Sequence, residues 1–88
     1  MKLRGEFVVR RVLDDIVAVP VGESVLRVGG MIMLNEVSRV IWQCLEQDVT
    51  EEEILKAVTD AFAVSPEEAR EDIREFLDKL RKMQLLEE

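Results

Sequence analysis

The hydrophobic pattern of this chain changes its period once, at Asn35, and this change constrains the fold more than any other feature. Before Asn35, short runs rich in valine and isoleucine alternate with turn residues, which is typical of strands. After Asn35, apolar residues recur at intervals of three and four, as they do in amphipathic helices. Strands that precede all the helices predict an α+β fold with an antiparallel sheet. Because 88 residues are too few for two independent cores, we expect residues 1–88 to form a single domain.

The first part of the chain, about residues 6–34, predicts three short strands joined as an antiparallel meander. Residues 7–13 form the first expected strand and residues 16–21 the second. The third is expected to cover residues 25–34, with Gly29-Gly30 as a bulge or bend within it. Tight turns between the three strands place them side by side in one sheet.

Three helix-start signals divide the rest of the chain. Asn35, Thr50 and Ser65 are residue types that favour the N-cap position. A glutamate follows Thr50 and Ser65 by three residues, which predicts a capping box at both starts. The helices expected from these signals cover about residues 35–47, 50–62 and 65–83.

Apolar stripes mark the faces that the first and third of these helices are expected to bury. Trp42 lies beside the first stripe, and we interpret it as a packing anchor at the margin rather than as a platform for a ligand. The stripe of the first helix is Val37, Val40, Ile41, Cys44 and Leu45. The stripe of the third helix is Ala69, Ile73, Phe76, Leu77, Leu80 and Met83.

The residue types present argue against several classes of enzyme. The chain has no histidine, so it lacks the commonest metal ligand and the commonest acid–base catalyst. The single cysteine, Cys44, cannot form an internal disulfide and suits a buried thiol in a reducing cytoplasm. Carboxylates gather at helix starts and along helix faces, not in a predicted apolar pocket. We therefore predict a cytoplasmic protein that is not an enzyme and that uses no metal or cofactor.

The net charge and the length of the apolar runs argue against two kinds of partner. Its net charge is −7, whereas nucleic-acid-binding domains normally carry a basic surface. Its apolar runs are far shorter than the roughly 20 residues that a membrane span requires. Neither nucleic acid nor membrane is an expected partner.

The third expected strand is the clearest candidate for a binding site. An edge strand leaves backbone N–H and C=O groups free to pair with an incoming strand. Residues 30–34 contain no charge and no proline to block such an edge, and Met31 and Met33 offer adaptable apolar contacts. The same two methionines could instead pack under a helix or a terminal segment. The residues alone leave both interpretations open.

Several short motifs occur in an order that is similar to that of one known family. They are Leu34-Asn35-Glu36, Ile41-Trp42, the helix start of residues 50–54, Asp72-Ile73 with Phe76-Leu77 and Leu80, and Leu85-Leu86. Together these motifs resemble the coenzyme PQQ synthesis protein D-like family, the recognition elements of ribosomal-peptide biosynthesis. The resemblance extends from Phe7 over nearly the whole chain. The turn after Pro20 departs from the members of the PQQ pathway itself, so we expect the pathway to be that of another modified peptide.

The resemblance implies a winged-helix-like domain with three strands followed by three helices, and it implies a function. Such a protein binds the leader segment of a precursor peptide without catalysing a reaction, and presents the peptide to a modifying enzyme, often a radical SAM protein. The leader adds as a further strand against the third strand, in the groove beside the third helix. Carried over to this chain, the peptide-binding residues are Met31, Ile32, Met33 and Leu34 on the strand and Arg70, Ile73, Arg74 and Leu77 on the helix. We expect a monomer or a weak dimer.

The two arginines in this set have an alternative role. Arg70 and Arg74 would form charge-assisted contacts with acidic residues of a leader. They could instead pair with acids of their own helix, which is worth only a few tenths of a kcal/mol for each pair. Those acids are Glu67, Glu71 and Asp78.

A winged-helix DNA-binding regulator is the alternative hypothesis for the whole protein. The second and third helices, joined by a short turn, resemble a helix-turn-helix. However, residues 67–82 carry six acidic and five basic side chains, so the would-be recognition helix is not basic. The wing of such proteins usually follows the recognition helix, whereas here the sheet precedes all the helices. Peptide binding is the hypothesis that the sequence favours.

Overall fold

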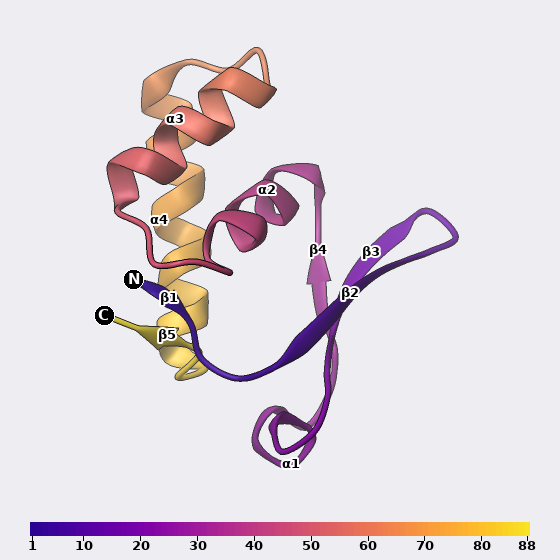
Figure 1. The fold of residues 1–88 in the computed structure, drawn as a ribbon. Helices are drawn as coiled ribbons and strands as arrows, with labels where there is room; N and C mark the ends of the chain where they lie inside the picture. Colours follow the sequence, from indigo (N-terminus) through magenta and orange to yellow (C-terminus); the bar gives the residue numbers. More distant parts are fainter.

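A three-stranded sheet, a two-stranded sheet and four helices make up the structure, and the three longer helices form one group beside the larger sheet (Figure 1). The computed structural model describes all residues, 1–88. In chain order its elements are β1 (Lys2–Leu3), β2 (Phe7–Val12), β3 (Asp15–Pro20), α1 (Ser24–Val28), β4 (Ile32–Leu34), α2 (Glu36–Cys44), α3 (Glu51–Ala61), α4 (Pro66–Lys82) and β5 (Leu86–Glu87). None of the helices combines the length and the apolar character that crossing a membrane requires.

The sheet has the order β2-β3-β4, and both pairings are antiparallel. β2 and β3 pair along their whole length, from Phe7 opposite Pro20 to Val12 opposite Asp15. β4 is short and pairs only Ile32–Leu34 with β3. The predicted α+β fold with a three-stranded antiparallel sheet is confirmed, and β2 and β4 are its two edges.

The prediction of one strand over residues 25–34 is wrong, because its first half forms the short helix α1. Ser24, at the start of α1, is buried, and its Oγ accepts a hydrogen bond from the Glu6 N–H at 2.8 Å. Gly29 ends the helix in the left-handed conformation, with φ 73°, and its N–H donates to the Val25 carbonyl. The glycine pair is therefore a helix stop rather than a bulge, and the structure has four helices instead of three.

A second sheet, which the sequence did not predict, joins the two ends of the described chain. β1 and β5 pair antiparallel, with Leu3 opposite Leu86. The Leu3 N–H donates to the Leu45 carbonyl and the Arg4 N–H to the Leu85 carbonyl, both at 2.8 Å. The pair of β1 and β5 therefore holds the segment after α4 close to the segment after α2.

The three predicted helix starts are confirmed by their caps. Oxygens of the Asn35, Thr50 and Ser65 side chains each accept a backbone N–H from three residues ahead. The capping box at Thr50 is complete, whereas at Ser65 the Glu68 side chain makes no reciprocal bond. Asn35 has a box that was not predicted, because the Ser38 hydroxyl accepts the Asn35 N–H at 2.7 Å. α2, the first of the three expected helices, ends at Cys44, three residues before the expected boundary.

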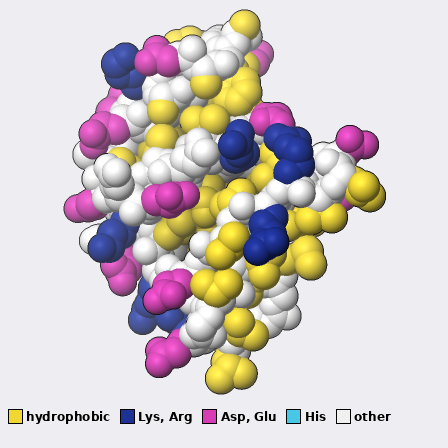
Figure 2. Space-filling model, turned by 45° about the vertical axis from the view of Figure 1, so that its right-hand side comes forward, with side chains coloured by type: hydrophobic (Ala, Val, Ile, Leu, Met, Phe, Trp, Pro, Cys, Tyr) yellow, Lys and Arg dark blue, Asp and Glu magenta, His cyan; other side chains and the backbone are white.

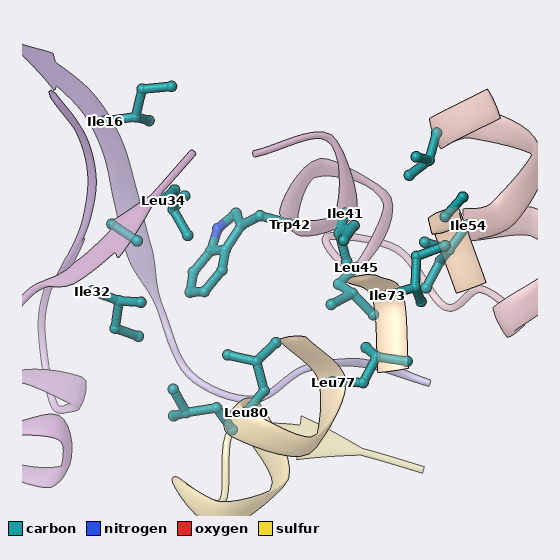
Figure 3. Close-up of a cluster of buried hydrophobic side chains, with 14 of the residues drawn as sticks. Ile16, Ile32, Leu34, Ile41, Trp42, Leu45, Ile54, Ile73, Leu77 and Leu80 are labelled. Atoms are coloured by element: carbon teal, nitrogen blue, oxygen red, sulfur yellow. The ribbon is translucent and has the colours of Figure 1, made fainter. Parts of the chain in front are cut away.

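The core lies between the sheet, α2 and α4, and Trp42 is its largest side chain (Figure 3). Trp42 is 1% exposed, so it is an anchor as predicted but lies inside the core rather than at its margin. Ile32 and Leu34 point toward it from β4, and Leu80 approaches from α4. Contacts from β4 and α4 make Trp42, which is itself on α2, the point where sheet and helices meet.

Met83 is exposed, and its predicted place in the core stripe of the last helix is therefore wrong. The reason is the end of α4: Met83 is the C-cap, and Gln84 takes a positive φ of 59° that turns the chain back. After this turn Leu85 enters the core, where it is almost fully buried. Leu85, and not Met83, is therefore the buried residue at this end of the chain.

Candidate functional site

The outer edge of β4 is open. β4 pairs with β3 on one side and with no strand on the other. Apart from the ladder with β3, no hydrogen bond involves the backbone of residues 30–34. Natural sheets usually block such an edge with a charge or a proline, and β4 has neither. The backbone groups on this side are therefore available to an incoming strand.

Side chains of the β4 segment alternate between the core and solvent. Ile32 is 3% and Leu34 7% exposed, and both belong to the core. Met31 and Met33 are 63% and 50% exposed. The sequence left two interpretations of these methionines open. The structure rules out the one in which they pack under a helix or a terminal segment. They lie at the surface beside the open edge.

A cavity of about 760 Å³ opens to solvent where β4, the start of α2 and the second half of α4 meet. We call it the β4–α4 groove. Its size is within the range of small-molecule and peptide-anchor pockets. Figure 2 shows hydrophobic side chains gathered over the middle and lower right of one face, with Lys or Arg side chains among them. The groove is lined by Met33, Asn35, Val37, Ser38, Ile41, Asp72, Glu75, Phe76, Asp78, Lys79, Lys82 and Met83.

The lining of the groove combines an apolar part with a charged part. Met33, Val37, Ile41, Phe76 and Met83 supply the hydrophobic surface. The charged side chains all come from α4 and include acids and bases. An elongated ligand with apolar side chains can bury them here while its polar groups reach the charged rim.

The helix residues expected to bind a peptide lie elsewhere on α4. Ile73 and Leu77 are fully buried in the core, and neither lines the groove. Arg70 donates to Glu52 of α3 at 2.8 Å, and Arg74 lies 3.5 Å from Glu51 of α3.

The partners of the two arginines are therefore neither the acids of their own helix nor groups in the groove. The hydrogen bond from Arg70 lowers the pKa of the Glu52 carboxyl and raises that of the guanidinium. Both pairs are exposed, and exposed ion pairs contribute little to stability. They join α4 to α3 on the side away from the groove, so a contact between these arginines and a peptide stays a prediction that the geometry does not favour.

The α4 residues that sequence reasoning missed share one stripe of the helix. Asp72, Phe76, Lys79 and Met83 follow one another at intervals of four, three and four, so they lie on one face. The apolar side chains of Phe76 and Met83 were visible in the sequence, but the helical period placed both of them in the core. Phe76 is in fact only partly buried, and it packs on the core from the groove.

The titratable groups of the structure give little support to catalysis. Burial raises the pKa of the Cys44 thiol, which keeps it protonated and weakly nucleophilic. No three His, Cys, Asp or Glu side chains are placed to hold a metal ion together. The open edge and the groove together offer backbone groups and an apolar surface to an extended chain.

Comparisons with known proteins agree with this geometry. A family model described as coenzyme PQQ synthesis protein D matches residues 12–86. The structure is similar to that of TbiB1 in complex with the TbiA(beta) leader peptide, with a TM-score of 0.74 and 30% sequence identity. The match covers 99% of this chain and 95% of the TbiB1 chain. No curated protein matches the sequence significantly.

Proposed function

The chain belongs to the coenzyme PQQ synthesis protein D family, and we propose that it binds the leader segment of a ribosomally synthesised precursor peptide. The observation that carries this proposal is the open edge of β4 beside the β4–α4 groove. It occurs in a fold that is similar over 99% of its length to a chain solved with a leader peptide. The protein therefore acts as a recognition element.

Binding proceeds by strand addition. The leader pairs its backbone with the outer edge of β4, and each new hydrogen bond contributes about 0.5–1.5 kcal/mol net. Because β4 has only three residues, this ladder is short, and it cannot alone give micromolar affinity, which corresponds to about −8 kcal/mol. Apolar side chains of the leader supply the rest by filling the groove over Met33, Phe76 and Met83, at about 25 cal/mol for each Å² buried.

The contact set that we propose keeps the strand residues expected from the sequence. Met31 and Met33 contact the leader with their side chains, and Ile32 and Leu34 contribute backbone groups while their side chains remain in the core. On α4, Ile73 and Leu77 act indirectly, because their burial holds the helix at the distance from β4 that leaves the groove open.

The partner that receives the peptide is a modifying enzyme, and the members of this family suggest a radical SAM enzyme. In this scheme the protein brings the leader to the enzyme and leaves the chemistry to it. The mixed lining of the groove and the weak nucleophilicity of Cys44 agree with this non-catalytic function.

No observation favours the DNA-binding alternative. α4 would be the recognition helix, and Asp72 and Glu75 line its groove-facing surface. These carboxylates would repel the phosphates that dominate affinity in such complexes. The family match and the TbiB1 match both support peptide binding instead.

The proposal is tested by adding the synthetic leader of the precursor encoded beside this gene to isotope-labelled protein. We expect a Kd at or below about 1–10 μM, as for other recognition complexes of modest size. Amide shifts should concentrate at residues 31–34 and 76–83. Shifts confined to β2 or α3, or no binding at 1 mM peptide, would contradict the proposed function.

A further inference from the structure

The charged side chains of the β4–α4 groove are separated by sign along α4. Asp72 and Glu75 line its first part, and Lys79 and Lys82 line its second part. None of these four forms an ion pair within the protein. The remaining charged residue of the lining, Asp78, is paired with Arg81 at 3.0 Å. The groove thus has an acidic end and a basic end, both without partners.

The helix dipole favours bases at the end of α4, but it does not explain why acids line the first part of the groove. Lys79 and Lys82 lie in the last turns of α4, where bases are favoured. Asp72 and Glu75, however, lie in the middle of the helix, and the acids of the first turn are Glu67 and Glu68. The two mid-helix carboxylates line the same groove as the two lysines, so all four side chains are accessible to a ligand in it.

The direction of an added strand fixes which of its ends meets which charge. Figure 1 shows β4 and α4 running in opposite directions, since β4 points up and α4 descends toward β5. The sheet is antiparallel throughout, and antiparallel pairing is the more stable and more frequent kind. A strand added antiparallel to β4 therefore runs in the same direction as α4. Its upstream end meets Asp72 and Glu75, and its downstream end meets Lys79 and Lys82.

The distance between the acidic and basic side chains on α4 determines how far apart the matching charges of a bound leader must be. Asp72 and Lys79 are seven residues apart, as are Glu75 and Lys82, which corresponds to about 10 Å along a helix that rises 1.5 Å per residue. An extended strand covers this distance in about three residues. Long lysine side chains extend the usable range to about two to four residues.

We propose that the β4–α4 groove selects and orients a leader segment with a basic residue upstream, an acidic residue about two to four residues downstream, and apolar residues between them. This inference rests on the proposed function and gives the bound leader a charge pattern and a direction. The acidic residue pairs with Lys79 and Lys82, and the basic residue pairs with Asp72 and Glu75. Reversed segments meet like charges at both ends, which is a means of rejecting them.

The first test compares two variants that each remove two positive charges from α4. K79Q/K82Q changes the groove, whereas R70Q/R74Q changes the side that faces α3. The probe is the synthetic leader of the neighbouring precursor. We expect K79Q/K82Q to weaken binding about three- to tenfold, as for the loss of two exposed ion pairs, with most of the difference lost at 0.5 M salt. A larger loss in R70Q/R74Q than in K79Q/K82Q would overturn the inference.

The second test changes the peptide, and its deciding comparison uses wild-type protein only. In a swapped leader, the acidic and basic residues of the docking segment exchange places while the composition stays the same. Wild-type protein should bind the swapped leader about three- to tenfold more weakly, and D72K/E75K/K79E/K82E should reverse this preference. Equal affinity of wild-type protein for both leaders would overturn the inference and leave the proposed function intact. If wild-type protein binds neither leader, the proposed function itself fails.

Discussion

The ring of Phe7 meets the indole of Trp42 edge to face, with ring centroids 5.0 Å apart and planes at 89°. This contact joins the first residue of β2 to the last turn of α2, and so connects the sheet to the helices. Edge-to-face pairs contribute about 0.5–1.5 kcal/mol beyond the area they bury. The relative position of β4 and α4 depends on this junction, because both elements pack on Trp42.

Replacing Trp42 should therefore destabilise the whole domain. Trp42→Ala is expected to lower the free energy of unfolding by about 3–5 kcal/mol, and the milder Trp42→Phe by less, because the cavity is smaller. Urea titration followed by circular dichroism measures both. Val12→Ala, on an exposed residue of β2, is the control and should stay within about 0.5 kcal/mol of wild type. A stable Trp42→Ala variant would mean that the core does not depend on this side chain.

The two neighbouring glycines after α1 should respond differently to alanine. Gly29 has φ 73°, a conformation that costs an alanine about 1–2 kcal/mol, although no atom lies near enough to obstruct the new Cβ. Gly30 has no such φ and equally open surroundings, so alanine there is expected to be neutral or slightly stabilising. Thermal unfolding should show a Tm lower by about 4–8 °C per kcal/mol for Gly29→Ala alone. Equal effects at both positions would contradict the observed helix stop.

Local sequence signals were enough to predict the helices that begin with a capping residue. Asn35, Thr50 and Ser65 each form the predicted cap, and the starts of the three helices follow from them. The segment at residues 24–28 could not be predicted in this way, since five residues that include two valines and a leucine fit a strand as well as one helical turn. Its conformation depends on Ser24, whose hydroxyl binds the backbone of Glu6, 18 positions earlier.

The sequence did not predict the elements whose conformation depends on contacts with distant parts of the chain. β1 and β5 have two residues each, and they exist because the described ends of the chain lie side by side. For the candidate site, the unblocked edge of β4 could be predicted from the residue types it contains. The face of α4 beside it could not, because the rotation of a helix about its axis depends on where α3 and β4 lie around it. Arg70 therefore faces α3, and Lys79 faces the groove.

The pairing of Glu52 with Arg70 gives stability a weak and defined pH dependence. The hydrogen bond from Arg70 lowers the pKa of Glu52 in the folded state, so the folded protein binds a proton there less readily than the unfolded chain. The contribution is therefore fully present above the ordinary glutamate pKa of about 4.3, and it is lost as the pH falls through the lowered value.

Arg70→Gln should raise the pKa of Glu52 toward its ordinary value, as followed by NMR of the Glu52 side chain. The stability difference between wild type and variant should shrink as the solution is acidified below about pH 4. A difference that grows on acidification would have the wrong sign for this pair. Lys56→Gln, which breaks the Lys56–Asp60 pair within α3, is a control that should leave the titration of Glu52 unchanged.

A lysine in place of Met33 should weaken peptide binding strongly without unfolding the protein. Met33 is half exposed at the open edge and lines the groove, so Met33→Lys is tolerated by the free protein. A bound strand would bury the new ammonium group beside Phe76 and remove its water, and charged residues on edge strands block strand addition in general. We expect at least a tenfold loss of affinity for the leader, measured by fluorescence anisotropy. Val12→Lys places the same charge on the other edge strand, at a residue of similar exposure, and should bind the leader as wild type does. If the two variants lose affinity equally, net charge explains the effect; if neither does, the leader does not dock on β4.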